Sequence, residues 1–217
     1  MIRVVLADDE PAIRVGVAAI LTTDPAIEVV AEAADGSQAV ELVRRHRPDI
    51  ALLDIRMPGF DGLSAAAELA AVAPAVAVVM LTTFDEDEYV ARALALGVSG
   101  FLLKAADPRE LILGVRSVAD GAAFLSPRIA QRVITKLGDG LVRSRTARTR
   151  LEQVTTRERE VLALVGRGMS NHEIARSLSL AEGTVKTHVS AILLRLGLKN
   201  RVQAAILAYE AGLAHDG

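Results

Sequence analysis

The chain of 217 residues contains no cysteine. Without thiols it can form neither a disulfide nor a zinc or redox site built on cysteine. Its four histidines are far apart in the sequence and show no spacing typical of metal ligands: His46, His172, His188 and His215. We therefore interpret none of them as a metal ligand or as a phosphorelay histidine.

Long apolar segments are also missing. The chain starts directly with a strand-like run, without the charged and apolar regions of a secretion signal, and no apolar run approaches the roughly 18 residues that span a membrane. The hydrophobic content of 51% and the mean hydropathy of +0.33 predict well-filled cores, and the length suits one or two domains. These features predict a soluble, cytoplasmic protein of two domains with no membrane partner.

Basic side chains are few in the first half of the chain, and acidic side chains are few in the second half. Residues 1–120 carry 10 basic and 19 acidic side chains, whereas residues 121–217 carry 15 basic and 8 acidic ones. An acidic half suits metal ions or basic protein surfaces, and a basic half of this size suits a polyanion. The charge distribution therefore predicts that nucleic acid binds to the carboxyl-terminal half.

Acidic residues follow two apolar runs of the amino-terminal half. The run 50–53 has the continuous apolar character of a strand buried in a parallel sheet, and Asp54 follows it. An aspartate at a strand end is by itself most often a turn former. A second run, 4–7, however, ends in Asp8 and Asp9. Neighbouring carboxylates repel one another unless a cation lies between them, and Mg²⁺ is the cation that prefers such oxygen ligands.

Two further strand-like runs end in residues that suit phosphate chemistry. The run 76–81 leads into Thr82, and the run 100–103 leads into Lys104. Carboxylates, a hydroxyl and an ammonium group are together suited to transferring a phosphoryl group to a carboxylate, with the metal neutralising charge. The four strand ends therefore predict a phosphoryl-transfer site with Asp54 as its centre.

Residues 2–120 resemble the receiver domain of two-component response regulators, in which a sensor histidine kinase is the phosphoryl donor. Ala105 departs from the family, which often has proline after the lysine, and we expect no cis peptide bond there. The resemblance implies a role for each matching residue: Asp54 as phosphoacceptor, Asp8, Asp9, Asp54 and the backbone carbonyl of Arg56 as Mg²⁺ ligands, Thr82 and Lys104 as phosphate contacts, and Phe101 as the switch aromatic.

Strands and helices alternate through this half, which predicts a parallel sheet with right-handed crossovers. Asp61 and Asp85 are expected to cap the third and fourth helices. The family resemblance implies a flavodoxin-like, doubly wound sheet of five strands in the order 2-1-3-4-5. The predicted helices span residues 11–23, 36–46, 62–72, 86–96 and 107–121, and a further strand spans 27–33.

A linker is predicted between the two halves. Ser126 and Pro127 are typical of the start of a short helix, which we expect to end near Leu137. Residues 143–150 are basic and polar without apolar periodicity, which indicates a solvated tether or, alternatively, an additional contact to phosphates. We predict a receiver domain at 1–121, a linker at 122–153 and a DNA-binding domain at 154–217.

The carboxyl-terminal half has the pattern of a helix-turn-helix. Thr156 is the predicted N-cap of a helix that ends near Val165 and lacks a full capping box, and Ser170 is the predicted N-cap of the next, at 171–178. After a brief turn comes a longer, basic helix at 183–196. Four apolar residues of this helix form one stripe: Val185, Val189, Ile192 and Leu196. Lys186, Thr187 and Ser190 then lie on the opposite face, where they can contact base edges in a major groove.

Residues 155–205 resemble the LuxR-type DNA-binding domain of the NarL/FixJ class, an all-α domain of four helices. The motifs that carry the resemblance are Arg157-Glu-Arg-Glu160, Ser170-Asn171, Glu173-Ile-Ala175, Thr184-Val-Lys-Thr-His188 and Leu196-Gly-Leu. Val154 and Ala181 depart from the usual leucine and capping serine. The predicted DNA contacts are Lys186, Thr187, Ser190, Thr184 and Arg201, and the resemblance implies that the last helix, 201–211, joins two copies on a palindromic operator.

The sequence thus predicts a transcription factor, not an enzyme, that binds promoter DNA as a homodimer when phosphorylated. One alternative is an aspartyl phosphatase or phosphotransferase. Such enzymes pair two aspartates two residues apart, however, and Arg56 stands at that spacing from Asp54. A second alternative is an orphan regulator whose receiver works without phosphorylation.

Overall fold

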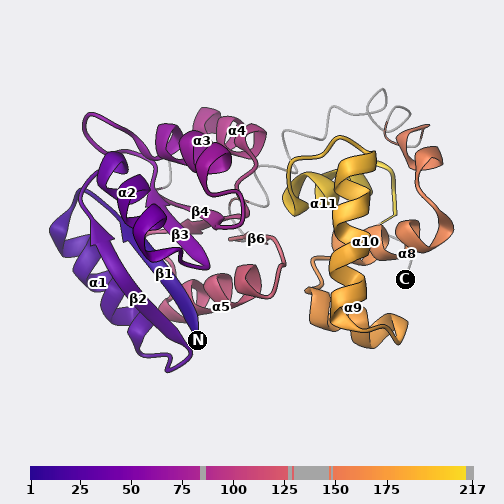
Figure 1. The fold of residues 1–217 in the computed structure, drawn as a ribbon, viewed down its shortest axis with the longest axis horizontal. Coiled ribbons are helices and arrows are strands. Elements are labelled where there is room, and N and C mark those ends of the chain that lie inside the picture. Colours follow the sequence, from indigo (N-terminus) through magenta and orange to yellow (C-terminus); the bar gives the residue numbers. More distant parts are fainter. Residues whose placement is uncertain (84–86, 127–128, 130–146, 148, 214–217) are drawn as a thin grey trace. The chain divides into compact units, whose positions relative to one another are not determined.

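The computed structural model describes residues 1–83, 87–126, 129, 147 and 149–213. Contacts divide the chain into two compact units (Figure 1). The first contains Met1–Ala119 and Phe124–Ser126, and the second contains Asp120–Ala123 and Pro127–Gly217. In the part of the chain that the structure describes, no helix is long and apolar enough to cross a membrane.

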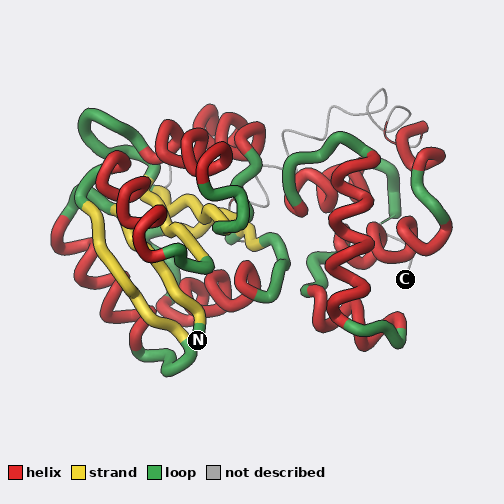
Figure 2. Tube along the Cα trace, viewed as in Figure 1, coloured by secondary structure: helices red, strands yellow, loops and turns green. Residues whose placement is uncertain are grey.

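The first unit is a parallel sheet with helices on both faces (Figure 2). The strand order is β2-β1-β3-β4-β5-β6, and every neighbouring pair is parallel. The predicted fold class and the order 2-1-3-4-5 are therefore confirmed, although a sixth strand extends the sheet. The strands are β1 (Ile2–Ala7), β2 (Ile27–Ala33), β3 (Ile50–Asp54), β4 (Ala77–Thr82), β5 (Gly100–Leu103) and β6 (Phe124–Leu125).

Helices α2, α3 and α4 cover one face of the sheet, and α1 and α5 cover the other (Figure 1). Asp61 caps α3 as predicted, because its carboxylate accepts the backbone N–H of Ser64 at 2.7 Å. The predicted cap Asp85 lies outside the described residues. The helices are α1 (Pro11–Thr22), α2 (Gly36–His46), α3 (Gly62–Val72), α4 (Asp87–Leu96) and α5 (Pro108–Ala119).

The sixth strand was not predicted. β6 has only two residues, which is too short for the alternation of apolar and polar side chains that identifies a strand. Its place in the sheet depends on Gly100, where an added Cβ atom would lie 2.7 Å from the carbonyl oxygen of Phe124. The backbone N–H of Ser126 donates to the carbonyl oxygen of Phe101 at 3.1 Å, which ties the end of β6 to β5.

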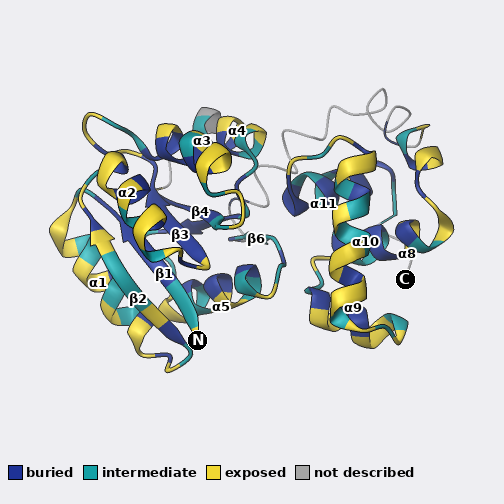
Figure 3. Cartoon of the chain, viewed as in Figure 1, coloured by how far each residue is buried: buried dark blue, intermediate teal, exposed yellow. Residues whose placement is uncertain are grey.

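The end of β3 is held tightly by the start of α3. All five residues of β3 are buried (Figure 3), which explains its unbroken apolar sequence before Asp54. A Cβ atom at Gly62 would lie 1.9 Å from the carbonyl oxygen of Asp54. Only glycine therefore lets α3 begin this close to the strand, and the contact places the backbone of Asp54.

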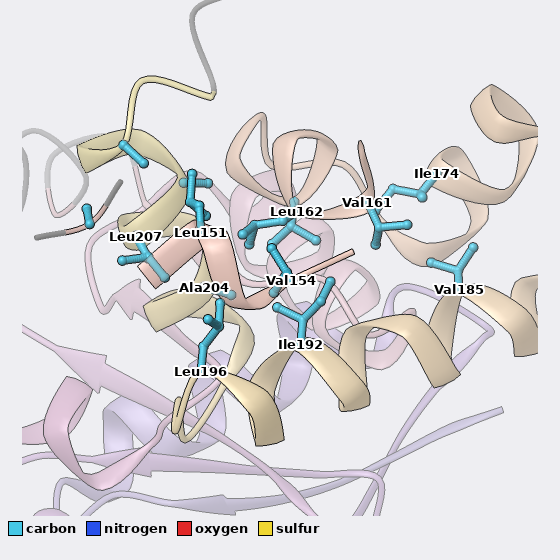
Figure 4. Close-up of a cluster of buried hydrophobic side chains, with 14 of the residues drawn as sticks. Leu151, Val154, Val161, Leu162, Ile174, Val185, Ile192, Leu196, Ala204 and Leu207 are labelled. Atoms are coloured by element: carbon cyan, nitrogen blue, oxygen red, sulfur yellow. The ribbon is translucent and has the colours of Figure 1, made fainter. Parts of the chain in front are cut away.

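The second unit is helical, as predicted. It contains α8 (Thr156–Gly166), α9 (Asn171–Leu178), α10 (Glu182–Arg195), α11 (Arg201–Glu210) and a short 3₁₀ helix, η1 (Leu151–Gln153). Side chains from all five helices form one apolar cluster (Figure 4). Helices α9 and α10 are joined by a turn at Ser179, whose left-handed backbone (φ 54°) ends α9.

One predicted cap was wrong by a single residue. Thr155, not Thr156, is the N-cap of α8, and this shift places Glu158 at the third helical position. Thr155 and Glu158 form a full capping box, in which each side chain bonds to the other residue's backbone N–H, at 3.2 and 2.8 Å. Two adjacent threonines made the sequence ambiguous, and the position of the glutamate decides between them.

Two parts of the predicted linker range, 122–153, are packed in the structure. Phe124 and Leu125 form β6, and Leu151 is buried in the core of the second unit. Arg150 donates to the carbonyl oxygen of Leu196, which ties the start of η1 to the end of α10. The described residues do not include most of the predicted short helix. They also exclude the basic segment up to residue 148, with the exception of Ala147.

We predict that Leu151→Ala destabilises the second unit. Leu151 is only 5% exposed, and removing a buried leucine side chain costs about 2–5 kcal/mol. Differential scanning calorimetry of the full chain should show the melting temperature of one transition falling by several degrees. Glu152→Ala changes the exposed neighbour and is the matched control. Equal melting temperatures for the two variants would show that η1 is not part of the packed core.

Candidate functional site

The carboxylates predicted at the strand ends meet at one edge of the sheet. β1 pairs with β3 so that Ala7 lies opposite Leu53, and Asp8 and Asp54 follow these two residues. One carboxylate oxygen from each of Asp8, Asp9 and Asp54 lies within 4.8 Å of the others. Asp8 and Asp54 are buried, while Asp9 is partly exposed. Three carboxylates at this distance suit a hard divalent cation such as Mg²⁺.

Lys104 is the cation of this cluster in the structure. Its ammonium nitrogen lies 3.0 Å from Asp8 Oδ2, 3.1 Å from Asp54 Oδ2 and 3.4 Å from Glu10 Oε1. Burial alone would lower the pKa of Lys104, but the contacts with Asp8 and Asp54 outweigh burial and raise it. The lysine is therefore charged and partly balances the buried carboxylates.

The environment of Asp54 disfavours its charge. Burial, with the repulsion of Asp8 and Asp9, raises the pKa of Asp54 to about 6, although the nearby Lys104 acts in the opposite direction. At pH 7 the side chain is still mostly ionised and can act as a nucleophile. Because one ammonium does not balance three carboxylates, the cluster retains an excess of negative charge that a divalent cation would neutralise.

The other predicted site residues of the first unit, Thr82, Phe101 and Arg56, lie on or just after strands β4, β5 and β3. Thr82 ends β4, is buried, and donates its hydroxyl to the carbonyl oxygen of Thr83 at 2.7 Å. Phe101 is fully buried in β5. Arg56 follows β3, and its guanidinium lies 5.8 Å from the ring centroid of Tyr89. The predicted metal contact of Arg56 concerns its backbone carbonyl and stays a prediction.

Sequence reasoning missed two neighbours of the cluster. Glu10 contacts Lys104, and Arg14 donates to the backbone carbonyl oxygen of Asp8 at 2.6 Å. Glu10 had a signal in the sequence, since it is the third acidic residue of a run, and it adds further negative charge beside Lys104. Arg14 had none, because its role depends on how α1 packs over the end of β1.

Helix α10 has one buried and one exposed face. Val185, Ile192 and Leu196 are buried and Val189 packs against the same core, which confirms the predicted apolar stripe. The predicted DNA contacts of this helix are all exposed: Thr184, Lys186, Thr187 and Ser190. The exposed face is therefore free to enter a groove of DNA.

Two of these exposed side chains have partners on α10. The ammonium nitrogen of Lys186 lies 3.5 Å from Glu182 Oε1, one helical turn earlier. The hydroxyl of Thr187 donates to the carbonyl oxygen of Gly183 at 3.0 Å, so that its oxygen, as an acceptor, and its methyl group are left for an outside contact. Ala181 is the N-cap of α10 and, as expected, provides no side-chain hydrogen bond.

Arg201 has internal partners in the structure, and its predicted phosphate contact stays a prediction. Arg201 is only 7% exposed, and its guanidinium donates to Asn171 Oδ1 at 2.7 Å and to the carbonyl oxygen of Met169. Burial lowers its pKa to about 10, so that it remains charged at neutral pH. The arginine holds α11 against the start of α9. Its sequence position at a helix start gave no sign of this, because the partners are 30 residues or more away.

A second internal contact steadies the end of α10. Arg195 lies 3.3 Å from the buried carboxylate of Glu158 and donates to the carbonyl oxygen of Gln153 at 3.3 Å. The hydrogen bond from the backbone of Thr155 lowers the pKa of Glu158, and Arg195 adds to this effect. The capping box of α8 thus also provides the anchor for α10.

Comparisons with known proteins agree with both units. Residues 4–116 match the response regulator receiver domain, and residues 152–208 match the bacterial regulatory proteins of the luxR family. The matches cover the acidic cluster of the first unit and the helix-turn-helix of the second. The chain therefore belongs to the response regulators that join a receiver to a LuxR-type DNA-binding domain.

Named relatives share this organisation over almost their full length. The transcriptional regulatory protein DegU of Brevibacillus brevis is 37% identical over 225 residues, covering 97% of this chain and 94% of the relative. The response regulator protein VraR of Staphylococcus aureus is 36% identical over 213 residues, covering 98% of each. This chain is thus similar to DNA-binding regulators of transcription that act in two-component systems.

Solved structures show the same likeness. The response regulator ChrA of a heme-sensing two-component system is 34% identical, with a TM-score of 0.54, and the match covers 98% of each chain. The receiver domain of a NarL regulator from Mycobacterium tuberculosis is 42% identical, with a TM-score of 0.54, and covers 55% of this chain and 97% of that one.

We predict that Arg201→Ala destabilises the second unit. The substitution leaves Asn171 Oδ1 and the Met169 carbonyl buried without their donor, which should cost about 1–3 kcal/mol. Calorimetry of the full chain should therefore show a lower melting temperature for this variant. Lys199→Ala changes an exposed cation two residues away and is the control. Unchanged stability of Arg201→Ala, together with weaker binding to all DNA sequences, would instead support the phosphate contact.

Proposed function

We propose that this response regulator accepts a phosphoryl group on Asp54 from a sensor histidine kinase and then binds promoter DNA as a dimer. The observation that carries the proposal is the cluster of Asp8, Asp9 and Asp54, whose two buried members, Asp8 and Asp54, pair with Lys104. These side chains could provide a carboxylate nucleophile, metal ligands and an ammonium group for phosphate oxygens, which supports the proposal.

The chemistry follows from the positions of these side chains. A carboxylate oxygen of Asp54 attacks phosphorus while the bond from phosphorus to the donor nitrogen breaks, and the donor imidazole leaves. Mg²⁺ held by Asp8, Asp9, Asp54 and the carbonyl of Arg56 would neutralise charge on the phosphoryl oxygens. Lys104 pairs with Asp54 in the structure and would transfer its contact to a phosphoryl oxygen.

We propose that Thr82 and Phe101 carry the response. The hydroxyl of Thr82 is bonded to the carbonyl of Thr83 in the structure and must give up this partner to reach a phosphoryl oxygen. Thr82 lies on β4 and Phe101 on β5, and these two strands are hydrogen-bonded neighbours. We expect a movement at the end of β4 to displace β5 as well. A change at this edge would alter the surface of the receiver and favour dimerisation.

Asp54→Asn should abolish phosphorylation while preserving the fold. The amide has nearly the shape of the carboxylate but is not a nucleophile. Incubation with acetyl phosphate and Mg²⁺, followed by intact mass spectrometry, should show a phosphorylated wild type and an unmodified variant, and chelation of Mg²⁺ should suppress the reaction of the wild type. Asp61→Asn, outside the cluster, should react normally. Equal phosphorylation of Asp54→Asn would exclude Asp54 as the acceptor.

Lys186→Ala should reduce sequence discrimination. Loss of a base contact costs about 1–3 kcal/mol on the specific site and leaves non-specific binding nearly unchanged, whereas loss of a phosphate contact weakens all sequences and lowers the salt dependence. Fluorescence anisotropy with a selected operator and a scrambled duplex, over a series of salt concentrations, separates the two cases. Lys199→Ala is the matched control. Equal weakening on both duplexes would show that Lys186 contacts only phosphates.

A further inference from the structure

Leu194 is the most exposed large apolar side chain in the part of the chain that the structure describes. It is 86% exposed, more than the amino-terminal methionine at 82%. The residue lies on α10, the longer helix of the helix-turn-helix. Its neighbour Leu193 packs against the core, whereas Leu194 is not among the residues packed there. The side chain of Leu194 is therefore available to a partner outside the domain.

The position of Leu194 on the helix points to DNA. It follows Thr187 and Ser190 at spacings of seven and four residues, which places the three on one face of the helix. The buried stripe that contains Val185 and Ile192 lies on the opposite face. With a rise of about 1.5 Å per residue, Leu194 lies about 6 Å along the helix from Ser190. A helix placed in the groove through Lys186 and Ser190 therefore also directs Leu194 at the DNA.

We propose that Leu194 contacts the C5-methyl group of a thymine in the major groove and so determines sequence specificity. The proposal rests on the proposed function, in which this face of α10 enters the groove. The thymine methyl is the apolar group that the major groove presents, and apolar side chains recognise it. Leucine offers no hydrogen bond to guanine, adenine or cytosine, and it would therefore favour thymine at one position of each half-site.

The surroundings of Leu194 favour DNA over a protein partner. A protein interface needs a contiguous apolar patch, whereas Leu194 has exposed Ser190 and Arg195 beside it. Thr187, about two turns earlier, donates its hydroxyl to the carbonyl oxygen of Gly183 and also carries a methyl group. The exposed face therefore has hydrogen-bonding groups at Lys186 and Ser190 and small apolar groups at Thr187 and Leu194.

The experiment removes the methyl group from the DNA. A duplex is selected with the phosphorylated protein from a random-sequence library, and each thymine is replaced in turn by deoxyuridine, which lacks only the C5-methyl. The wild type should bind one such duplex about fourfold more weakly, which corresponds to about 0.8 kcal/mol for one buried methyl. Leu194→Ala should bind the thymine duplex more weakly by a similar factor and should not distinguish it from the deoxyuridine duplex.

Three control variants make the assignment specific. Leu194→Met keeps an apolar side chain and should retain the discrimination. Thr187→Ser removes only a methyl group and should affect a different thymine, if any. Leu113→Ala makes the same change at another exposed leucine, on α5, and should leave the deoxyuridine pattern unchanged.

Two results would overturn the proposal. One is an undiminished response of Leu194→Ala to every deoxyuridine, and the other is equal weakening on all duplexes together with loss of dimerisation in light scattering, which would indicate a contact between protein copies. Failure of the proposed function is distinguished by Lys186→Ala. If that variant weakens selected and scrambled duplexes equally, and the wild type distinguishes no deoxyuridine duplex, then α10 does not read bases through this face.

Discussion

The burial of two carboxylates, Asp8 and Asp54, beside one ammonium group and a third carboxylate is the constraint on which the first unit depends. Parallel strands bring Asp8 and Asp54 to one edge of the sheet, and Gly62 fixes the backbone of Asp54 from the side of α3. Lys104 follows β5 and pairs with the carboxylates of both Asp8 and Asp54. The cluster still carries a net negative charge. This excess is unfavourable for the resting fold, and a divalent cation bound at the site would neutralise it.

The buried charges of the second unit, in contrast to those of the first, are balanced or hydrogen-bonded within the unit. Arg201 is bonded to Asn171 and to the carbonyl of Met169, and Glu158 is bonded to Thr155 and paired with Arg195. Each buried charge thus finds its partners inside the unit, which makes breaking any one of these contacts costly. The consequence is a rigid support for α10, whose outer face keeps its side chains exposed.

Much of the fold could be predicted from the sequence, because the strongest signals are local. The apolar run before Asp54 and the 3.6-residue stripe of α10 both follow directly from burial on a single element. Other features depend on partners far along the chain. The burial of Arg201 depends on α9, and the two residues of β6 depend on the space at Gly100. A helix start or a two-residue run carries no signal of such distant contacts.

The same distinction applies to the sites. The spacing of Asp54, Thr82 and Lys104 identifies a receiver because strand ends of a parallel sheet converge by topology alone. DNA contacts are harder to predict from the sequence, because it does not show which basic side chains are exposed. Lys186 is exposed and can contact bases, whereas Arg201 is buried and bonds within the unit. In the second unit the buried side chains of Arg201 and Glu158 have their partners within the unit. Burial and hydrogen bonding, which the sequence does not display, thus separate these structural residues from the exposed residues of α10.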